Sequence, residues 1–174
     1  MIATDTGNLA MTSFTPDPSN PRQLRDAFGR FATGVTIVTV ATDDGPMAIT
    51  ANSFSSLSLD PPLVMWAPDK SSRRFAHFAQ AEHFAIHILA HDQDDICWKV
   101  ARDGACLLDA ELTQNVEGVP ILPNCLARFE CSQYASYDGG DHEIIVGKVL
   151  RAATRKSGDA LGFFKGNMKI FTDK

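Results

Sequence analysis

Residues 34–67 read GVTIVTVATDDGPMAITANSFSSLSLDPPLVMWA, and this stretch decides the fold. Residues 35–42 are rich in β-branched side chains and predict a strand. The DDGP turn and the apolar residues after it predict a hairpin whose second strand covers residues 47–54. A row of small polar residues follows. Pro61 and Pro62 then exclude a helix, and residues 63–67 predict a short buried strand.

The remaining chain adds three predicted helices and further strands. The first helix is expected to begin at Asn20, a capping residue followed by Pro21, and to end at Gly34. Its apolar residues would share one face: Leu24, Ala27, Phe28 and Phe31. The other elements are predicted as helices over residues 71–82 and 93–104, and as strands over residues 83–90, 125–137, 143–154 and 161–172.

These elements amount to about seven strands and three helices, joined by links of hairpin length. The alternation of strands and helices that is typical of a parallel sheet is absent. Short antiparallel strands in this number usually close into a barrel, which removes exposed edges. The sequence therefore predicts a mainly β protein, an antiparallel barrel with helices packed outside it. This domain is expected over residues 21–174, after a flexible arm at residues 1–20.

Composition excludes several classes of function. The net charge of −5 and the pI of about 5.4 argue against a nucleic-acid-binding face, which usually needs a basic surface. No apolar run reaches the ~18 residues of a membrane helix, and the first residues lack a secretory signal. The four cysteines are irregularly spaced, which favours reduced thiols over a disulfide framework or a zinc site. We therefore expect a cytoplasmic protein.

Three histidines at a spacing of four, His83, His87 and His91, would stack on one face of a helix and hold a metal. The alternation of apolar residues around them instead favours a strand. On a strand, His83 and His87 would lie about 13 Å apart, too far to share one ion. No metal site is predicted.

The hydroxyl-rich row after the second strand needs a partner. Alternation puts Thr50 and Asn52 on one side of the strand and Ala51 and Ser53 on the other, so neither side is apolar throughout. Such a strand end cannot pack in a dry core without hydrogen-bond partners. Either water or a flat polar ligand would occupy the space beside it.

Residues 70–74, KSSRR, supply an anion site in the same region of the sequence. Serines at a predicted helix start offer free amides, and arginine can bind phosphate through two hydrogen bonds. Together the two segments predict a groove for a flat heterocycle and a seat for its phosphate. A hydrophilic loop followed by an ordinary capped helix explains the same residues equally well.

Two later motifs add candidate residues. His142 follows a turn at the start of a strand, where a histidine can donate to a cofactor or move protons. Asp141 could orient His142 or stabilise the turn, and the turn is favoured. Gly147 suggests a bulge or a close approach of another backbone. Near the C-terminus, an aromatic residue of the FFKGN motif could stack on a ring, and Lys165 could meet a phosphate.

Four segments carry a family resemblance, in this order: RDAFGRFATGVTIVTV, ITANSFSSLSLDPPLVMWA, GDHEIIVGKV and LGFFKGNMKIF. Together they resemble the flavin reductase family, which has the FMN-binding split-barrel fold. Small reductase components of two-component flavin monooxygenases belong to this family. The resemblance covers residues 24–171, and the second segment is its most specific part.

The resemblance implies a set of functional residues. It implies flavin contacts at Thr50, Ala51, Asn52, Ser53 and Ser56, and phosphate contacts at Ser71, Ser72 and Arg73. It places His142 near the nicotinamide and the flavin ring, as the candidate catalytic residue. It also permits a lid role for Phe164 and Lys165. The family forms homodimers with the flavin in a groove between two barrels.

The expected activity is therefore transfer of a hydride from NADH or NADPH to FMN or FAD, with the reduced flavin passing to a separate oxygenase. Two alternatives remain open. One is a reductase with tightly bound flavin that acts on another acceptor, such as a corrinoid or an iron complex. The other is a flavin-binding redox carrier without a nicotinamide step.

Overall fold

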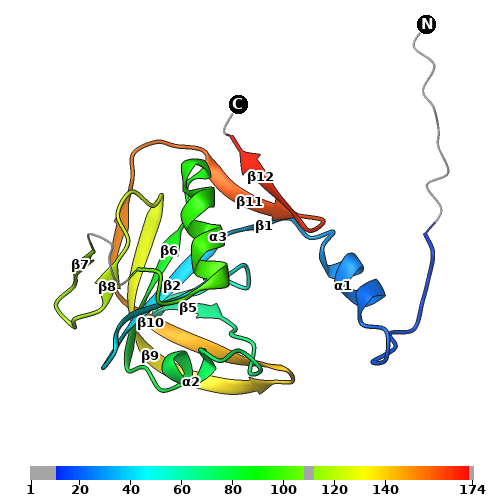
Figure 1. The fold of residues 1–174 in the computed structure, drawn as a ribbon, viewed down its shortest axis with the longest axis horizontal. Coiled ribbons are helices and arrows are strands. Elements are labelled where there is room, and N and C mark those ends of the chain that lie inside the picture. The colour runs from blue at the N-terminus through cyan, green and yellow to red at the C-terminus, as the bar shows by residue number, and fades with distance from the viewer. Residues whose placement is uncertain (1–10, 108–111, 173–174) are drawn as a thin grey trace, which may run out of the picture.

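The computed structural model describes residues 11–107 and 112–172, and antiparallel strands dominate it (Figure 1). Its main sheet has seven strands in the order β3-β2-β6-β9-β10-β5-β4. The strands are β2 Thr36–Thr42, β3 Gly45–Ala51, β4 Ser55–Leu59, β5 Pro62–Trp66, β6 His83–Ile88, β9 Ala127–Gly139 and β10 His142–Thr154. Every pairing in this sheet is antiparallel, which confirms the expected class.

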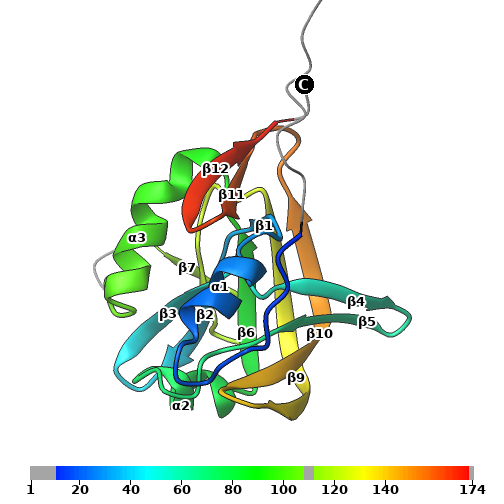
Figure 2. The same cartoon turned by 90° about the vertical axis from the view of Figure 1, so that its right-hand side faces the viewer.

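Smaller elements surround this sheet. A three-stranded sheet contains β1 Thr33–Gly34, β11 Ala160–Phe164 and β12 Asn167–Phe171, and a short ribbon contains β7 Thr113–Gln114 and β8 Pro120–Ile121. The helices are α1 Arg22–Phe28, α2 Phe75–Ala79, the 3₁₀ turn η1 His91–Gln93 and α3 Asp94–Arg102. Figure 2 shows α3 and the β11–β12 hairpin beside the main sheet, with α1 on the near side.

The link between β3 and β4 forces the main sheet to curl. These strands are consecutive in the chain but lie at opposite ends of the strand order. In a flat seven-stranded sheet they would be about 29 Å apart. The three linking residues, 52–54, span at most about 15 Å. The sheet therefore bends until its edges approach, which gives the barrel-like shape that the sequence predicts.

The interior divides into two apolar clusters. Inside the curl, Trp66 packs edge-on against Phe78 with ring centroids 5.5 Å apart, and Phe84 lies 6.2 Å from the same indole. The second cluster joins α3 to the sheet through Cys97 and Val100, which are fully buried. Full burial of one large apolar side chain contributes about 1.5–3 kcal/mol. This second cluster fixes α3 against β3, where the candidate site lies.

Two strand predictions need correction. The serine row is not only a loop, because Ser55–Leu59 forms β4 and pairs with β5. The expected strand over residues 161–172 is a hairpin, β11 and β12. Its turn residues Lys165 and Gly166 both have positive φ, 51° and 76°, as a tight type I′ turn requires. A lysine rarely occupies that conformation, so the sequence carried a weak turn signal.

The first two helices are shorter than predicted. Pro21 precedes α1, the Asn20 side chain makes no cap bond, and Gly29 rather than Gly34 ends the helix. No residue of α1 is buried, and Phe28 and Phe31 are 69% and 77% exposed. The second helix, α2, covers only Phe75–Ala79, and Arg74 stands at its start without a side-chain cap bond.

Four further features of the described residues bear on the sequence predictions. Residues 11–20 are exposed and contain no helix or strand; residues 1–10 of the predicted arm lie outside the described part. All four cysteines are free thiols, and Cys97 and Cys131 are buried. No described helix is long and apolar enough to cross a membrane. Gly147 lies at a β-bulge, where an added Cβ would come within 2.5 Å of Phe84.

Candidate functional site

Two of the predicted hydroxyls at the end of β3 are held by the main chain. Thr50 donates its hydroxyl to the carbonyl of Cys97 on α3, with an oxygen–oxygen distance of 3.0 Å. Ser53 accepts from the N–H of Ala67 at 2.9 Å and donates to the Ala67 carbonyl at 3.1 Å. These bonds hold the strand end against α3 and β5. The neighbouring Asn52 side chain is exposed and has no side-chain hydrogen bond among the described residues.

An apolar cavity of about 250 Å³ adjoins this strand end, and we call it the ring cavity. It is lined by Val35, Thr50, Ala51, Asn52, Cys97, Trp98, Ala101, Phe163 and Met168. Trp98 is 44% exposed although it stands on a packed helix. Burial raises the pKa of the Cys97 thiol to about 11, so this wall carries no charge. Aromatic and small side chains on facing walls suit a flat ring.

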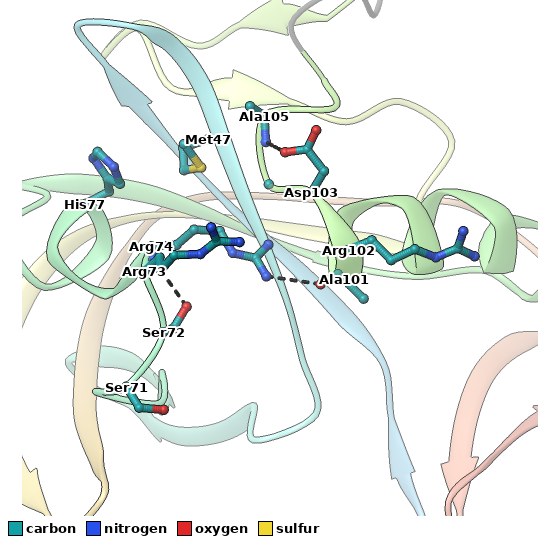
Figure 3. A pocket seen from close by; sticks show the side chains of 11 residues that line it. Met47, Ser71, Ser72, Arg73, Arg74, His77, Ala101, Arg102, Asp103 and Ala105 are labelled. Carbon is teal, nitrogen blue, oxygen red and sulfur yellow. Dashed lines mark hydrogen bonds between the residues drawn. The ribbon is translucent and has the colours of Figure 1, made fainter.

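A larger cavity of about 620 Å³, the basic cavity, shares Ala101 with the ring cavity. Figure 3 shows its side chains, which come from β3, from α2 and the loop before it, and from the end of α3 and the residues that follow it. Three arginines line it, Arg73, Arg74 and Arg102, with Asp103 as the acidic residue of the lining. Ser71, Ser72 and Arg73, which the sequence assigns to phosphate, all lie here.

The three basic residues of the KSSRR segment have different roles. Arg74 donates to the carbonyls of Ala48, Val100 and Ala101 at 3.0, 2.7 and 3.2 Å, and burial lowers its pKa. It therefore ties the loop to β3 and α3. Lys70 pairs with Asp138 and donates to the carbonyl of Gly140 at 2.8 Å. Arg73 is exposed and has no side-chain partner among the described residues, which leaves it available for an anion.

The serines of this loop form a turn. Asp69 accepts from both the hydroxyl and the N–H of Ser71, each at 2.7 Å, and these two bonds lower the pKa of the Asp69 carboxyl. The hydroxyl of Ser72 accepts from the N–H of Arg74 at 3.3 Å. The loop is therefore fixed before any ligand arrives, with Ser71 exposed at the cavity wall.

His142 lies beside this loop. Its backbone forms a bridge with Asp69, and Lys70 donates its N–H to the carbonyl of Asp141 at 2.9 Å. The His142 ring nitrogen Nδ1 lies 2.8 Å from the Asp141 carboxylate, and the side chain is 42% exposed. This contact fits the alternative that the sequence left open beside the turn role, in which the Asp141 carboxylate orients the histidine. His142 lines neither cavity within this chain.

The remaining sequence candidates lie farther from the ring cavity. Ser56 is exposed on β4, opposite Val64, and lines neither cavity. Phe164 also lies outside both cavities, and the Lys165 ammonium sits 5.2 Å from its ring. The neighbouring Phe163 faces the other side of β11 and lines the ring cavity.

Sequence reasoning missed three residues of the site: Trp98, Arg102 and Gly104. The first two stand on α3, whose packing against β3 no local pattern shows. Gly104 follows this helix, and an added Cβ would come within 2.5 Å of both the Ala48 carbonyl and the Arg74 side chain. One sequence signal could have indicated Trp98: on the predicted helix it directly follows the buried Cys97, which places it at the edge of the buried face.

The site and fold match a known family. The family model of the flavin reductase like domain covers residues 28–172 of the chain. The chain belongs to the flavin reductase family. A solved structure has the same fold as this chain. The NADH:FAD oxidoreductase SgcE6 of Streptomyces globisporus C-1027 superposes with a TM-score of 0.85 at 32% identity, and the match covers 94% of this chain and 99% of SgcE6.

Curated relatives carry the same activity in their names. The FMN reductase (NADH) SmoA of Agrobacterium fabrum is 53% identical over 159 residues, which cover 91% of each chain. BorF, the flavin reductase component of a bacterial two-component tryptophan halogenase, is 36% identical with a TM-score of 0.80, over 88% of this chain and 99% of BorF. Some flavin reductase relatives are longer: the chain spans 47% of the reductase component of trigonelline monooxygenase from Acinetobacter baylyi, at 43% identity over 83% of this chain.

Proposed function

We propose that this chain is an NADH-dependent flavin reductase that supplies reduced FMN or FAD to a separate monooxygenase component. One observation carries the proposal: the apolar ring cavity adjoins, at the shared lining residue Ala101, a cavity lined by Arg73 and Arg102. A flavin has the same succession of parts, a flat apolar ring and an anionic phosphate tail. The named activities of the relatives support the same function.

The residues of the ring cavity would bind and align the flavin. A bound flavin supplies N5 as the acceptor for a hydride from C4 of the nicotinamide. Trp98 and Phe163 would help to exclude water from a bound ring, and Asn52 would offer it an amide hydrogen-bonding group. If both reactants bind together here, their encounter would need no further collision in solution. Arg73 and Arg102 would hold the phosphate, while Arg74 keeps the loop in place.

We assign His142 the role of a proton or hydrogen-bond donor near the reacting rings. Two observations support this role. The contact with Asp141 orients the imidazole, and the backbone bridge to Asp69 places His142 beside the loop that carries Ser71 and Arg73. His142→Ala is expected to slow NADH oxidation more than it weakens flavin binding. Equal losses in turnover and in flavin affinity would contradict this role.

We also propose a homodimer. The β4–β5 hairpin projects from the sheet in Figure 2, and its Leu57 and Leu59 are 51% and 97% exposed. Phe28 and Phe31 add a second exposed apolar surface. Such surfaces in one chain favour association, and the second copy would bring its own residues to the open side of the groove. Leu59→Glu is expected to shift the sedimentation coefficient from dimer to monomer, and an unchanged value would count against this surface.

The decisive experiment is anaerobic stopped-flow reduction of added FMN and FAD by NADH. A colourless protein that oxidises NADH only when flavin is added supports the diffusing-flavin reductase. A yellow colour that survives dialysis would instead favour the tight flavoprotein that reduces another acceptor. Flavin binding without any NADH oxidation would favour the redox carrier.

A further inference from the structure

A third cavity, of about 330 Å³, lies between α1 and the turn that joins β11 to β12; we call it the α1 cavity. Three cationic residues line it, Arg25, Arg30 and Lys165, against one acidic residue, Asp26. The chain as a whole carries a net charge of −5, so a cluster of three cationic residues differs in sign from the protein's net charge. Across residues 11–107 and 112–172, none of the three cations forms an ion pair.

The α1 cavity is built next to the ring cavity. Phe163 lines both, so the two cavities adjoin at this side chain. The N–H of Lys165 donates to the carbonyl of Gly29 at 2.8 Å, which ties the end of α1 to the hairpin turn. Helix α1 buries no side chain, so apolar packing does not explain why it sits here. The cations are thus held at a fixed place beside the proposed ring site.

The three cavities form a series. The basic cavity adjoins the ring cavity at Ala101, and the α1 cavity adjoins it at Phe163, so the apolar ring cavity has a cationic neighbour at each of these two lining residues. One flavin phosphate accounts for one seat. The second substrate of the reaction proposed above is a nicotinamide dinucleotide. Its diphosphate carries two negative charges, separate from those of the flavin phosphate. Arginine pairs well with such groups because its planar fork matches phosphate oxygens.

We propose that Arg25 and Arg30 bind the diphosphate of the nicotinamide dinucleotide, with Phe163 separating that diphosphate from the reacting rings. This inference rests on the proposed flavin reductase function and adds the seat of the second substrate. FAD carries a diphosphate as well, so the experiment must separate the two dinucleotides. Both arginines are exposed, so their replacement does not disturb the core.

The test compares Arg25→Gln and Arg30→Gln with Arg22→Gln, an exposed arginine on the same helix that does not line the cavity. With FMN as the acceptor, each of the first two variants is expected to raise the KM for NADH about five- to tenfold at unchanged kcat. The KM for reduced nicotinamide riboside, which lacks both phosphates, stays at the wild-type value. Arg22→Gln leaves all constants unchanged.

Three results would overturn the proposal: an unchanged KM for NADH in both variants, an equal rise for the riboside, or a weaker affinity for FAD with no change for NADH. Calorimetric titration with ADP-ribose, which has the diphosphate but no nicotinamide, measures binding at the α1 cavity without any turnover. Its affinity should fall in Arg25→Gln and Arg30→Gln only, and equal affinities would also overturn the proposal. Failure of the proposed function looks different, because the wild type would then reduce no flavin at all.

Discussion

His87 makes the stability of this protein sensitive to mild acid. It lies on β6 and is fully buried. Its Nδ1 donates to the carbonyl of Ile37 at 3.0 Å, and its Nε2 accepts from the N–H of Leu122 at 3.1 Å. Both bonds require a neutral ring with the proton on Nδ1. Burial, opposed in part by the bond to Ile37, lowers the pKa of His87 from 6.5 to about 4.

The magnitude follows from linkage between protonation and folding. Because the folded pKa lies below the unfolded one, the unfolded chain takes up a proton first as the pH falls. The contribution of the neutral ring is therefore complete above pH 6.5 and is lost between pH 6.5 and about 4. The expected loss is about 2 kcal/mol between pH 7 and pH 5, and about 3 kcal/mol in total. Either value is a large part of the stability of an ordinary domain.

Urea unfolding at pH 7, 6 and 5 measures this loss, with the fluorescence of the buried Trp66 as the signal. Protein concentration is held constant because association would also shift the midpoint. His87→Gln keeps one donor and one acceptor but does not titrate, so its free energy of unfolding should fall by about 2 kcal/mol less than that of the wild type. His91→Gln, at an exposed histidine, should follow the wild type. Parallel pH profiles for the wild type and His87→Gln would refute the reasoning.

Three further predictions concern the cavities. Asn52→Leu should weaken flavin binding by about tenfold, measured by fluorescence titration, while the thermal midpoint stays unchanged because the side chain is exposed. Arg73→Gln should raise the Kd for FMN about tenfold but leave that for riboflavin, which lacks the phosphate, unaltered. Gly104→Ala should lower the free energy of unfolding by about 1–3 kcal/mol in urea, since its Cβ would strike Ala48 and Arg74, whereas Gly34→Ala, with nothing within 4 Å, should be neutral.

Much of the fold was accessible from local patterns. The β-branched run at residues 35–42 and the apolar alternation at residues 83–90 correspond to β2 and β6. The same alternation correctly predicted a strand rather than a helix at His83 and His87. Within the described residues, no cluster of three metal-ligating side chains occurs. Period-two patterning is decisive here because side chains alternate across a strand wherever that strand lies.

Element ends were less predictable. The four apolar residues of the first helix, from Leu24 to Phe31, suggested a longer helix than α1. Their face is not packed within this chain, so nothing rewards continuing the helix past Gly29. The turn at Lys165 was missed for a different reason, because its conformation is imposed by the pairing of β11 with β12.

Local patterns were enough to predict antiparallel strand pairing, with a polar row and a basic segment between the strands. Which of those polar and basic groups are available to a ligand depends on contacts between distant segments. Side-chain hydrogen bonds to the backbone of other segments occupy Thr50, Ser53 and Arg74. Asn52 and Arg73 are exposed and make no such bond among the described residues. The physical reason is that alternation fixes the side of a strand on which a residue lies, while its partner comes from a segment far along the chain. The meeting of α3 with β3 and of α1 with the β11–β12 turn is therefore visible only in three dimensions.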